Sequence, residues 1–352
     1  MGQTETKTRT IRELKSKDTE DKDTSSNFKL GITLVLIASL MLSFQNVVTK
    51  VILSEKHVFG IFTMGGILKP SMGNSLLLMI LRMVVTLPVM AFIVAPKIHK
   101  NTWVDIKSLI HYTNRGRLIA AFGSAMCLFA SQFFIYLALG SIPTGVATTI
   151  FFVYPTITIL LVWIFFGEKP PLSLVFAMLT IYIGGFLTIP ITAFEGRTGG
   201  IYNYPLGATT GVLSGICFAG YMVLIKQARM HPVPFTIVSF STILVAGSLM
   251  LPLFHFHVES QNWIPLAIGV LILGLTTLVG YLLNNFGVPL IGPSLTSVIG
   301  SSGPAMTAFM AYFLIAEKLN LYQALGVFLV TLWVLGISVE NMKKTQKPPA
   351  PK

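Results

Sequence analysis

A single arginine stands inside an apolar stretch of this sequence. Arg82 lies about two turns into residues 75–95, which contain no other charged residue. A buried guanidinium can hold a carboxylate or a phosphate through two parallel hydrogen bonds. Burying it at the centre of a membrane helix costs about 2.5–3.5 kcal/mol. Arg82 is therefore either a solute-binding group that faces a central cavity, or a side chain that reaches the outer membrane interface or bonds helix-end carbonyls.

Uncharged polar residues inside other apolar stretches form a second group of candidates for solute binding. Any one of them equally fits a helix–helix hydrogen bond, which contributes only about 0.6 kcal/mol on average. As a group at membrane depth they favour a central binding site. The candidates are Asn46, Gln132, Tyr136, Thr149, Tyr154, Tyr221, Tyr281, Asn285, Ser301 and Ser302.

Other charged residues stand at the edges of the apolar stretches. Lys50 and Lys226 fit anchors at the membrane interface better than solute ligands. Glu168 and Glu317 are each followed by Lys, which fits a terminal ion pair or a helix cap better than proton coupling. No acidic residue of residues 30–352 falls in the middle of an apolar stretch, which argues against a carboxylate relay.

Catalytic, metal and cofactor patterns are not apparent. His255 and His257 lack two further ligands nearby, and the two cysteines, Cys127 and Cys217, form no CxxC motif. No Ser/His/Asp order, HExxH pattern or GxxxxGK[ST] loop occurs, so we expect no enzyme, metal, cofactor or ATP site. The basic residues lie in connectors without interleaved aromatic residues, which argues against nucleic acid as a partner.

These residues must be positioned by membrane helices. The chain has 352 residues, of which 53% are apolar and 11% charged, against about 25% charged in soluble domains. A spanning helix needs about 20 apolar residues. Ten such windows occur, near residues 30–53, 75–95, 117–139, 142–166, 172–193, 206–226, 234–254, 263–283, 291–315 and 321–340.

The distribution of basic residues predicts the orientation. With ten spans, 19 of the 25 Lys and Arg residues fall on the side that carries both termini, and four fall on the opposite side. Cytoplasmic connectors are enriched in Lys and Arg, so both termini are expected to be cytoplasmic. Residues 1–29 are too polar to fold alone and predict a disordered tail, and residues 341–352 predict a basic tail.

The two halves of the sequence resemble each other. Gly31 and Lys50 recur as Gly207 and Lys226, displaced by 176 positions, while a second set recurs with a displacement of 149. Two five-helix units in one chain enter the membrane in opposite directions, so residues 30–193 and 206–340 predict an inverted 5+5 repeat. The alternative is a structural membrane protein whose repeat records only gene duplication. The residues displaced by 149 are Ile142, Pro155, Glu168 and Lys169, which recur as Ile291, Pro304, Glu317 and Lys318.

The displacement of 149 also relates two pairs of polar residues and one pair of prolines. Gln132 corresponds to Tyr281 and Tyr136 to Asn285, as a shared central site would require. Pro155 and Pro304 fall inside spans, where each removes a backbone hydrogen bond. The two prolines are either hinges for a rocking motion or fixed bends around a cavity.

Several of these residues carry a family resemblance. The run from Tyr136 to Leu139, then Ile142 to Ala147, Tyr154-Pro155 and Phe166-Gly167-Glu168 is similar to the central signature of the EamA-type drug/metabolite transporter superfamily. The resemblance covers about residues 30–340. It implies ten helices in two EamA-like repeats and transport of a small organic metabolite, commonly export. The chain departs from the family pattern at Ser301-Ser302 and in the long connectors of its first half.

The sequence thus predicts an all-α integral membrane protein with ten transmembrane helices in an inverted 5+5 repeat. We expect a secondary transporter of the plasma (inner) membrane that exports an amino acid or related solute by alternating access. One alternative is an exchanger of phosphorylated or nucleotide-linked solutes, and another is an intramembrane enzyme or scaffold. The expected partners are the lipid bilayer and a small organic solute, and the sequence does not distinguish a monomer from a homodimer.

Overall fold

The structure is a computed structural model that is helical throughout most of its described part. It describes residues 2–53, 56–58, 62–69, 71–109, 115–142, 144–170, 204–300 and 302–315, and single positions within 172–183 and 321–328. The longer helices are α1 Gly2–Leu53, α2 Met72–Pro88, α5 Arg115–Ser141, α7 Tyr154–Phe166, α9 Tyr204–Ala228, α10 Pro232–Met250, α11 Trp263–Ile291 and α13 Gly303–Ile315. The shorter elements are β1 Lys56–Val58, β2 Phe62–Met64, η1 Val89–Val94, α3 Ala95–Ile98, α4 Thr102–Ser108, α6 Thr144–Phe151, η4 Leu251–Leu253, η5 Ser260–Asn262 and α12 Pro293–Gly300.

Six helical segments of the described part are long and apolar enough to cross a membrane. Their side chains agree with a lipid environment, because Phe92, Ile119, Leu249 and Ile264 are 70–76% exposed on the outside of the bundle. The segments are Ser26–Leu53, Met72–Ile98, Arg115–Leu139, Pro205–Ala228, Pro232–Leu253 and Ser260–Ile291. They coincide with the first, second, third, sixth, seventh and eighth predicted spans. The predicted spans 172–193 and 321–340 lie almost wholly outside the described residues.

The predicted spans at residues 142–166 and 291–315 are each divided into two helices. The first region is divided into α6 and α7 by a short break at Phe152 and Val153. The second is divided into α12 and α13 after Gly300. Pro155 explains the first break. It stands in the first turn of α7, where the helix needs no N–H from it, whereas inside a continuous helix its missing N–H would remove a hydrogen bond.

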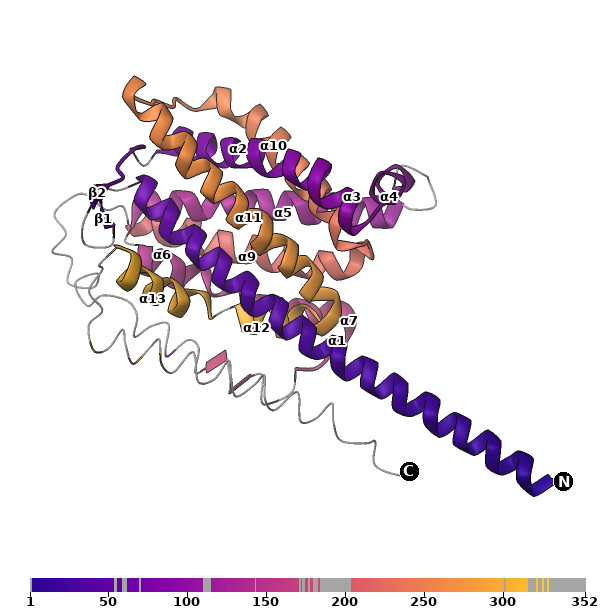
Figure 1. Ribbon diagram of the computed structural model, residues 1–352. Coiled ribbons are helices and arrows are strands. Elements are labelled where there is room, and N and C mark those ends of the chain that lie inside the picture. The colour runs from indigo at the N-terminus through magenta and orange to yellow at the C-terminus, as the bar shows by residue number, and fades with distance from the viewer. Residues whose placement is uncertain are drawn as a thin grey trace.

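The N-terminal tail also differs from its expectation. Residues 2–29 continue the helix of the first span instead of forming a disordered segment, so α1 begins at Gly2. Extending an existing helix needs no new nucleus, which favours helical continuation into a polar stretch. Figure 1 shows this indigo part of α1 projecting past the other helices.

Other irregularities have local causes. Pro88 at the end of α2 is followed by the wide π-helical turn of η1, because proline donates no backbone hydrogen bond there. The helix α7 ends at Gly167, whose φ of +70° places it in the left-handed region that favours glycine. In the connector after α1, the strands β1 and β2 pair antiparallel as a short ribbon.

The long helices pack in two antiparallel pairs. The helix α1 lies along α11, and α5 lies along α9 (Figure 1). The helices α2 and α10 pack against each other and cover one side of these pairs, while α6, α7, α12 and α13 lie on the other side. Polar side chains of the central helices therefore meet in the interior of the bundle.

Candidate functional site

A cavity lies between the central helices. About 860 Å³ of space in and around it is not filled by protein atoms, a figure that includes the solvent at its open mouth. Its walls come from α1, α5, α9 and α11 and from both helix breaks. The polar residues of the wall are Ser39, Ser43, Gln45, Asn46, Ser131, Gln132, Tyr136, Thr148, Tyr154, Tyr281, Asn284 and Thr296.

Aromatic rings form one side of the cavity at the break between α6 and α7. Phe151, Phe152, Tyr154 and Phe218 pack with ring centroids 4.8–5.4 Å apart. Tilted and edge-on pairs of this kind are favourable and hold the rings in fixed positions. The hydroxyl of Tyr154 donates to the carbonyl of Ser297 across 3.1 Å, so it also joins the two broken helices.

Arg82 lies directly behind the opposite wall. Its side chain is completely buried, with 0% exposure. Nη1 donates to the hydroxyl of Tyr136 at 2.8 Å, and Nη2 donates to Oε1 of Gln132 at 3.2 Å. The amide of Gln132 donates in turn to the hydroxyl of Tyr281. A chain of hydrogen bonds therefore connects α2, α5 and α11 along the cavity wall.

The charge of Arg82 is not neutralised within the described part of the chain. No carboxylate of these residues pairs with it, and its buried Nε has no hydrogen-bond partner there. The backbone carbonyl of Arg82 accepts a 2.7 Å bond from Thr86, whose hydroxyl also lies 3.0 Å from the carbonyl of Gly274 in α11. A buried cation without an anion raises the affinity of the adjacent cavity for negative charge.

Two further polar contacts fix the surrounding helices. Tyr221 donates to Oδ1 of Asn285, and Nδ2 of Asn285 donates to Thr236 at 2.8 Å, which joins α9, α11 and α10. Thr277 donates to Oε1 of Gln45 at 2.7 Å, which joins α11 to α1. Most polar groups around the cavity are thus paired, as buried polar groups must be.

Comparisons with known proteins identify the family. Residues 205–339 match the EamA-like transporter family. The chain is also 37% identical over 315 residues to the uncharacterized transporter sll1319 of Synechocystis sp., an alignment that covers 89% of this chain and 94% of that protein. The chain belongs to the EamA-like transporter family. It is an integral, multi-pass membrane protein of the lipid bilayer, and its family assigns it to transport.

A solved structure shares the fold of this EamA-like transporter. A crystal structure, titled only as that of a protein, aligns with a TM-score of 0.58 over 92% of this chain and 99% of that chain. The two sequences are 16% identical, so the likeness concerns the fold alone.

The structure brings five of the predicted site residues of the EamA-like transporter onto the cavity wall. These are Asn46, Gln132, Tyr136, Tyr154 and Tyr281. Arg82, Tyr221 and Asn285 are buried but do not line the wall, and Arg82 reaches it through its two acceptors. Full burial also removes the interpretation that Arg82 extends to the membrane interface. Ser302 is buried beside the second helix break, whereas Ser301 and the side chains of Thr149 and Pro304 lie outside the described residues.

Sequence reasoning missed other wall residues of the transporter. Ser39 and Ser43 stand one turn apart on α1 and continue to Asn46, so a polar stripe at helical spacing was available as a signal. No polar stripe at helical spacing marks the other missed wall residues, which are Gln45, Thr148, Asn284 and Thr296. Their place on the wall depends on how the helices rotate against one another.

Two of the charged residues predicted to lie at helix ends contact each other. Lys226 contacts the carboxylate of Glu168, and its ammonium lies 4.5 Å from the ring centroid of Phe166. This contact agrees with the terminal ion-pair interpretation of Glu168. No three His, Cys, Asp or Glu side chains within the described ranges are placed to hold a metal ion.

Proposed function

We propose that this EamA-like transporter moves a small organic solute by alternating access through the central cavity. The observation that carries the proposal is the cavity itself, whose wall is drawn from α1, α5, α9 and α11 and from both broken helices. A site between two bundles opens to either side when one bundle rocks against the other.

Several contacts support an inverted repeat of residues 30–193 and 206–340. The helices α6 and α7 begin and end at positions that match α12 and α13 with the constant displacement of 149. The displacement of 149 also relates α5 to α11, whereas the displacement of 176 relates α1 to α9. The packed pair α1 with α11 therefore corresponds to the packed pair α9 with α5. Gln132 and Tyr281 correspond to each other and share a hydrogen bond, as two positions on a pseudo-twofold axis would.

The chemistry of the wall supports a solute with a carboxylate and an apolar part, such as an amino acid or a related metabolite. The aromatic group around Phe151 and Phe218 suits the apolar part. Gln132 and Tyr136, polarised by the buried Arg82, suit a carboxylate. The described wall contains no Lys or Arg, so it offers little support for a phosphorylated solute.

We propose cytoplasmic termini and efflux across the plasma membrane. The Lys and Arg residues of the connectors favour cytoplasmic termini, and efflux is the direction that the family resemblance implies. Because the sequence has no ATP-binding loop, a gradient or an exchange of solutes supplies the energy.

Metabolite profiles test this function. Cells that lack the protein and cells that overproduce it are compared for solutes in the cell and in the spent medium. We expect at least one amino-acid-like solute to move to the medium only when the wild type is present. Purified protein in liposomes then transports that solute. Accumulation inside overproducing cells would reverse the direction, and product formation by detergent-solubilised protein would overturn transport in favour of an enzyme.

A pair of tyrosine variants tests the site. Tyr136→Phe removes the acceptor of Arg82 on the cavity wall, whereas Tyr312→Phe makes the same change on a half-exposed side chain of α13. Loss of one hydrogen bond to a charged group costs about 1.5–3 kcal/mol. We expect transport to fall about tenfold or more in Tyr136→Phe and to be unchanged in Tyr312→Phe. Equal transport by both variants would remove Tyr136 from the site.

A further inference from the structure

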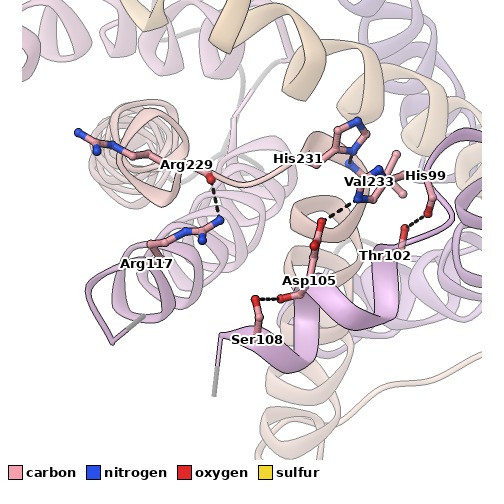
Figure 2. Close-up of polar contacts among 8 residues, drawn as sticks. All are labelled: His99, Thr102, Asp105, Ser108, Arg117, Arg229, His231 and Val233. Carbon is pink, nitrogen blue, oxygen red and sulfur yellow. Dashed lines mark hydrogen bonds and ion pairs between the residues drawn. The ribbon is translucent and has the colours of Figure 1, made fainter. Parts of the chain in front are cut away.

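A pair of histidines joins three elements at one end of the bundle, away from the cavity. His99 follows α3, and His231 precedes α10. Their rings are stacked with centroids 4.0 Å apart and planes inclined by 12°. His99 Nε2 lies 2.7 Å from Oδ2 of Asp105 in α4. Figure 2 shows the two imidazoles and the carboxylate facing one another between the segments that carry them.

His231 also caps the N-terminus of α10. Its Nδ1 accepts a 3.3 Å hydrogen bond from the backbone N–H of Val233. This bond requires an unprotonated Nδ1, because a protonated ring nitrogen has no lone pair to accept with. Burial lowers the pKa of His231, and the neighbouring His99 lowers it further, while Asp105 acts in the opposite direction.

The other elements around His231 contribute few charges. Arg117 of α5 donates to the carbonyls of Ala228 at 3.3 Å and Arg229 at 2.8 Å, in the turn just before His231. Figure 2 shows this contact beside the histidine pair. From α11 the ring of Phe286 meets His231 edge-on at 5.6 Å and carries no charge. The described titratable groups that act on His231 are therefore His99 and Asp105, while Arg117 contacts the backbone of the turn before it.

We propose that His231 is a proton-binding site that releases the segment of α3 and α4 from α10 when this face of the protein becomes acidic. Protonation removes the acceptor of the Val233 N–H and places a cation at the positive end of the α10 dipole. It also sets that cation against the stacked ring of His99. Each of these changes weakens the contact that holds the segment of α3 and α4 against the start of α10, which is the docked state.

The direction of the pH dependence follows from the lowered pKa. His231 binds a proton more readily when the segment is released than when it is docked, so docking is strongest above the ordinary histidine pKa of about 6.5. The stabilisation is lost as pH falls through 6.5 towards the lower pKa of the docked state. The cytoplasmic location of this face is part of the proposed function. The release of α3 and α4 from α10 does not depend on that function.

The helix that is capped by His231 reaches the polar core. Thr236, one turn further along α10, accepts the hydrogen bond of Asn285. A loosened start of α10 therefore changes the packing next to the cavity network. On this basis acidification of the same face is expected to alter the transport rate, which makes the histidine pair a regulatory site.

The experiment follows Trp103, which lies on α4 beside Asp105 and is 49% exposed. The full-length protein carries Trp163→Phe, Trp263→Phe and Trp333→Phe, so Trp103 alone fluoresces, and acrylamide quenching is measured in detergent from pH 8 to pH 5. We expect the quenching constant to rise about twofold with a midpoint below 6.5. Asn is a favoured N-cap that does not titrate in this range, so His231→Asn keeps the α10 cap.

His231→Asn is expected to give a flat pH profile, and His257→Asn, a histidine outside this cluster, is expected to keep the transition. A flat profile in the wild type, or the same transition in His231→Asn, would overturn the proposal. The measurement needs no solute, so its outcome is independent of whether transport is detected. Circular dichroism across the same pH range separates release of α4 from unfolding.

Discussion

Replacing Gln132 by glutamate tests how the buried cation of Arg82 is used. The substitution keeps the shape of the side chain and introduces a carboxylate where Oε1 of Gln132 now lies, 3.2 Å from Nη2 of Arg82. Gln132→Glu therefore supplies from within the protein the anion that we propose the solute supplies.

The expected change in stability is small. At an effective dielectric constant of about 20, opposite unit charges 3.2 Å apart attract by about 5 kcal/mol. Removing a carboxylate from water costs several kcal/mol, which cancels most of this attraction. The net effect is about 1 kcal/mol, which moves the midpoint of thermal unfolding of a chain of this length by about 1–2 °C.

The expected change in transport is large. A solute carboxylate loses a hydrogen-bonding partner that is polarised by a cation, which is worth about 1.5–3 kcal/mol, or about 10–150-fold in affinity. The solute carboxylate is also repelled by the carboxylate that the substitution introduces. Uptake or efflux of the carboxylate solute by proteoliposomes, measured over a range of solute concentrations, is expected to show this loss.

Gln45→Glu is the matched control. Gln45 lines the same cavity, but its partner is Thr277 and not a basic residue. A carboxylate there has no cation to offset its burial, so it lowers the unfolding midpoint more than Gln132→Glu does. Wild-type transport by Gln132→Glu would refute the proposed role of Arg82. Equal destabilisation by both variants would refute the electrostatic reasoning.

Three further substitutions test the packing and polar contacts. Tyr221→Phe leaves Oδ1 of Asn285 without its described donor and should cost about 1–3 kcal/mol, seen as a lower unfolding midpoint, and an unchanged midpoint would contradict the bond. Gly73→Ala places a Cβ 2.0 Å from the carbonyl oxygen of His255 and should cost about 1–3 kcal/mol, whereas Gly116→Ala, which meets open space, should not destabilise. Lys226→Gln should cost no more than about 1 kcal/mol, because the side chains of Lys226 and Glu168 are 35% and 55% exposed, and high salt should weaken the wild-type contact similarly.

Six of the ten predicted spans and the presence of Arg82 within one of them were predictable, because both depend on local composition. A run of about 20 apolar residues fits a bilayer regardless of its neighbours. Arg82 is conspicuous for the same reason. The family was also predictable, since its signature lies within one contiguous stretch around Tyr136 to Glu168.

The contacts of the site were less predictable because they are set by helix rotation. The partners of Arg82 are 50 and 54 positions away, on a helix whose rotation the apolar pattern does not define. The exact positions of the two helix breaks were also not predictable from the sequence. Phe152 still bonds to the carbonyl of Thr148, while Val153 bonds to that of Ile150, and this change of hydrogen bonding depends on packing against other helices. Proline alone marks only that some bend occurs.

The burial of Arg82 has a consequence for how the protein is made. Arg82 is synthesised before Gln132 and Tyr136, which follow it by 50 and 54 positions. Until they arrive, the guanidinium in lipid costs about 2.5–3.5 kcal/mol with no partner to offset it. We therefore expect α2 to become more stable in the membrane once α5 has entered beside it. Nascent chains truncated before residue 132 should hold the second span less stably than chains that include α5.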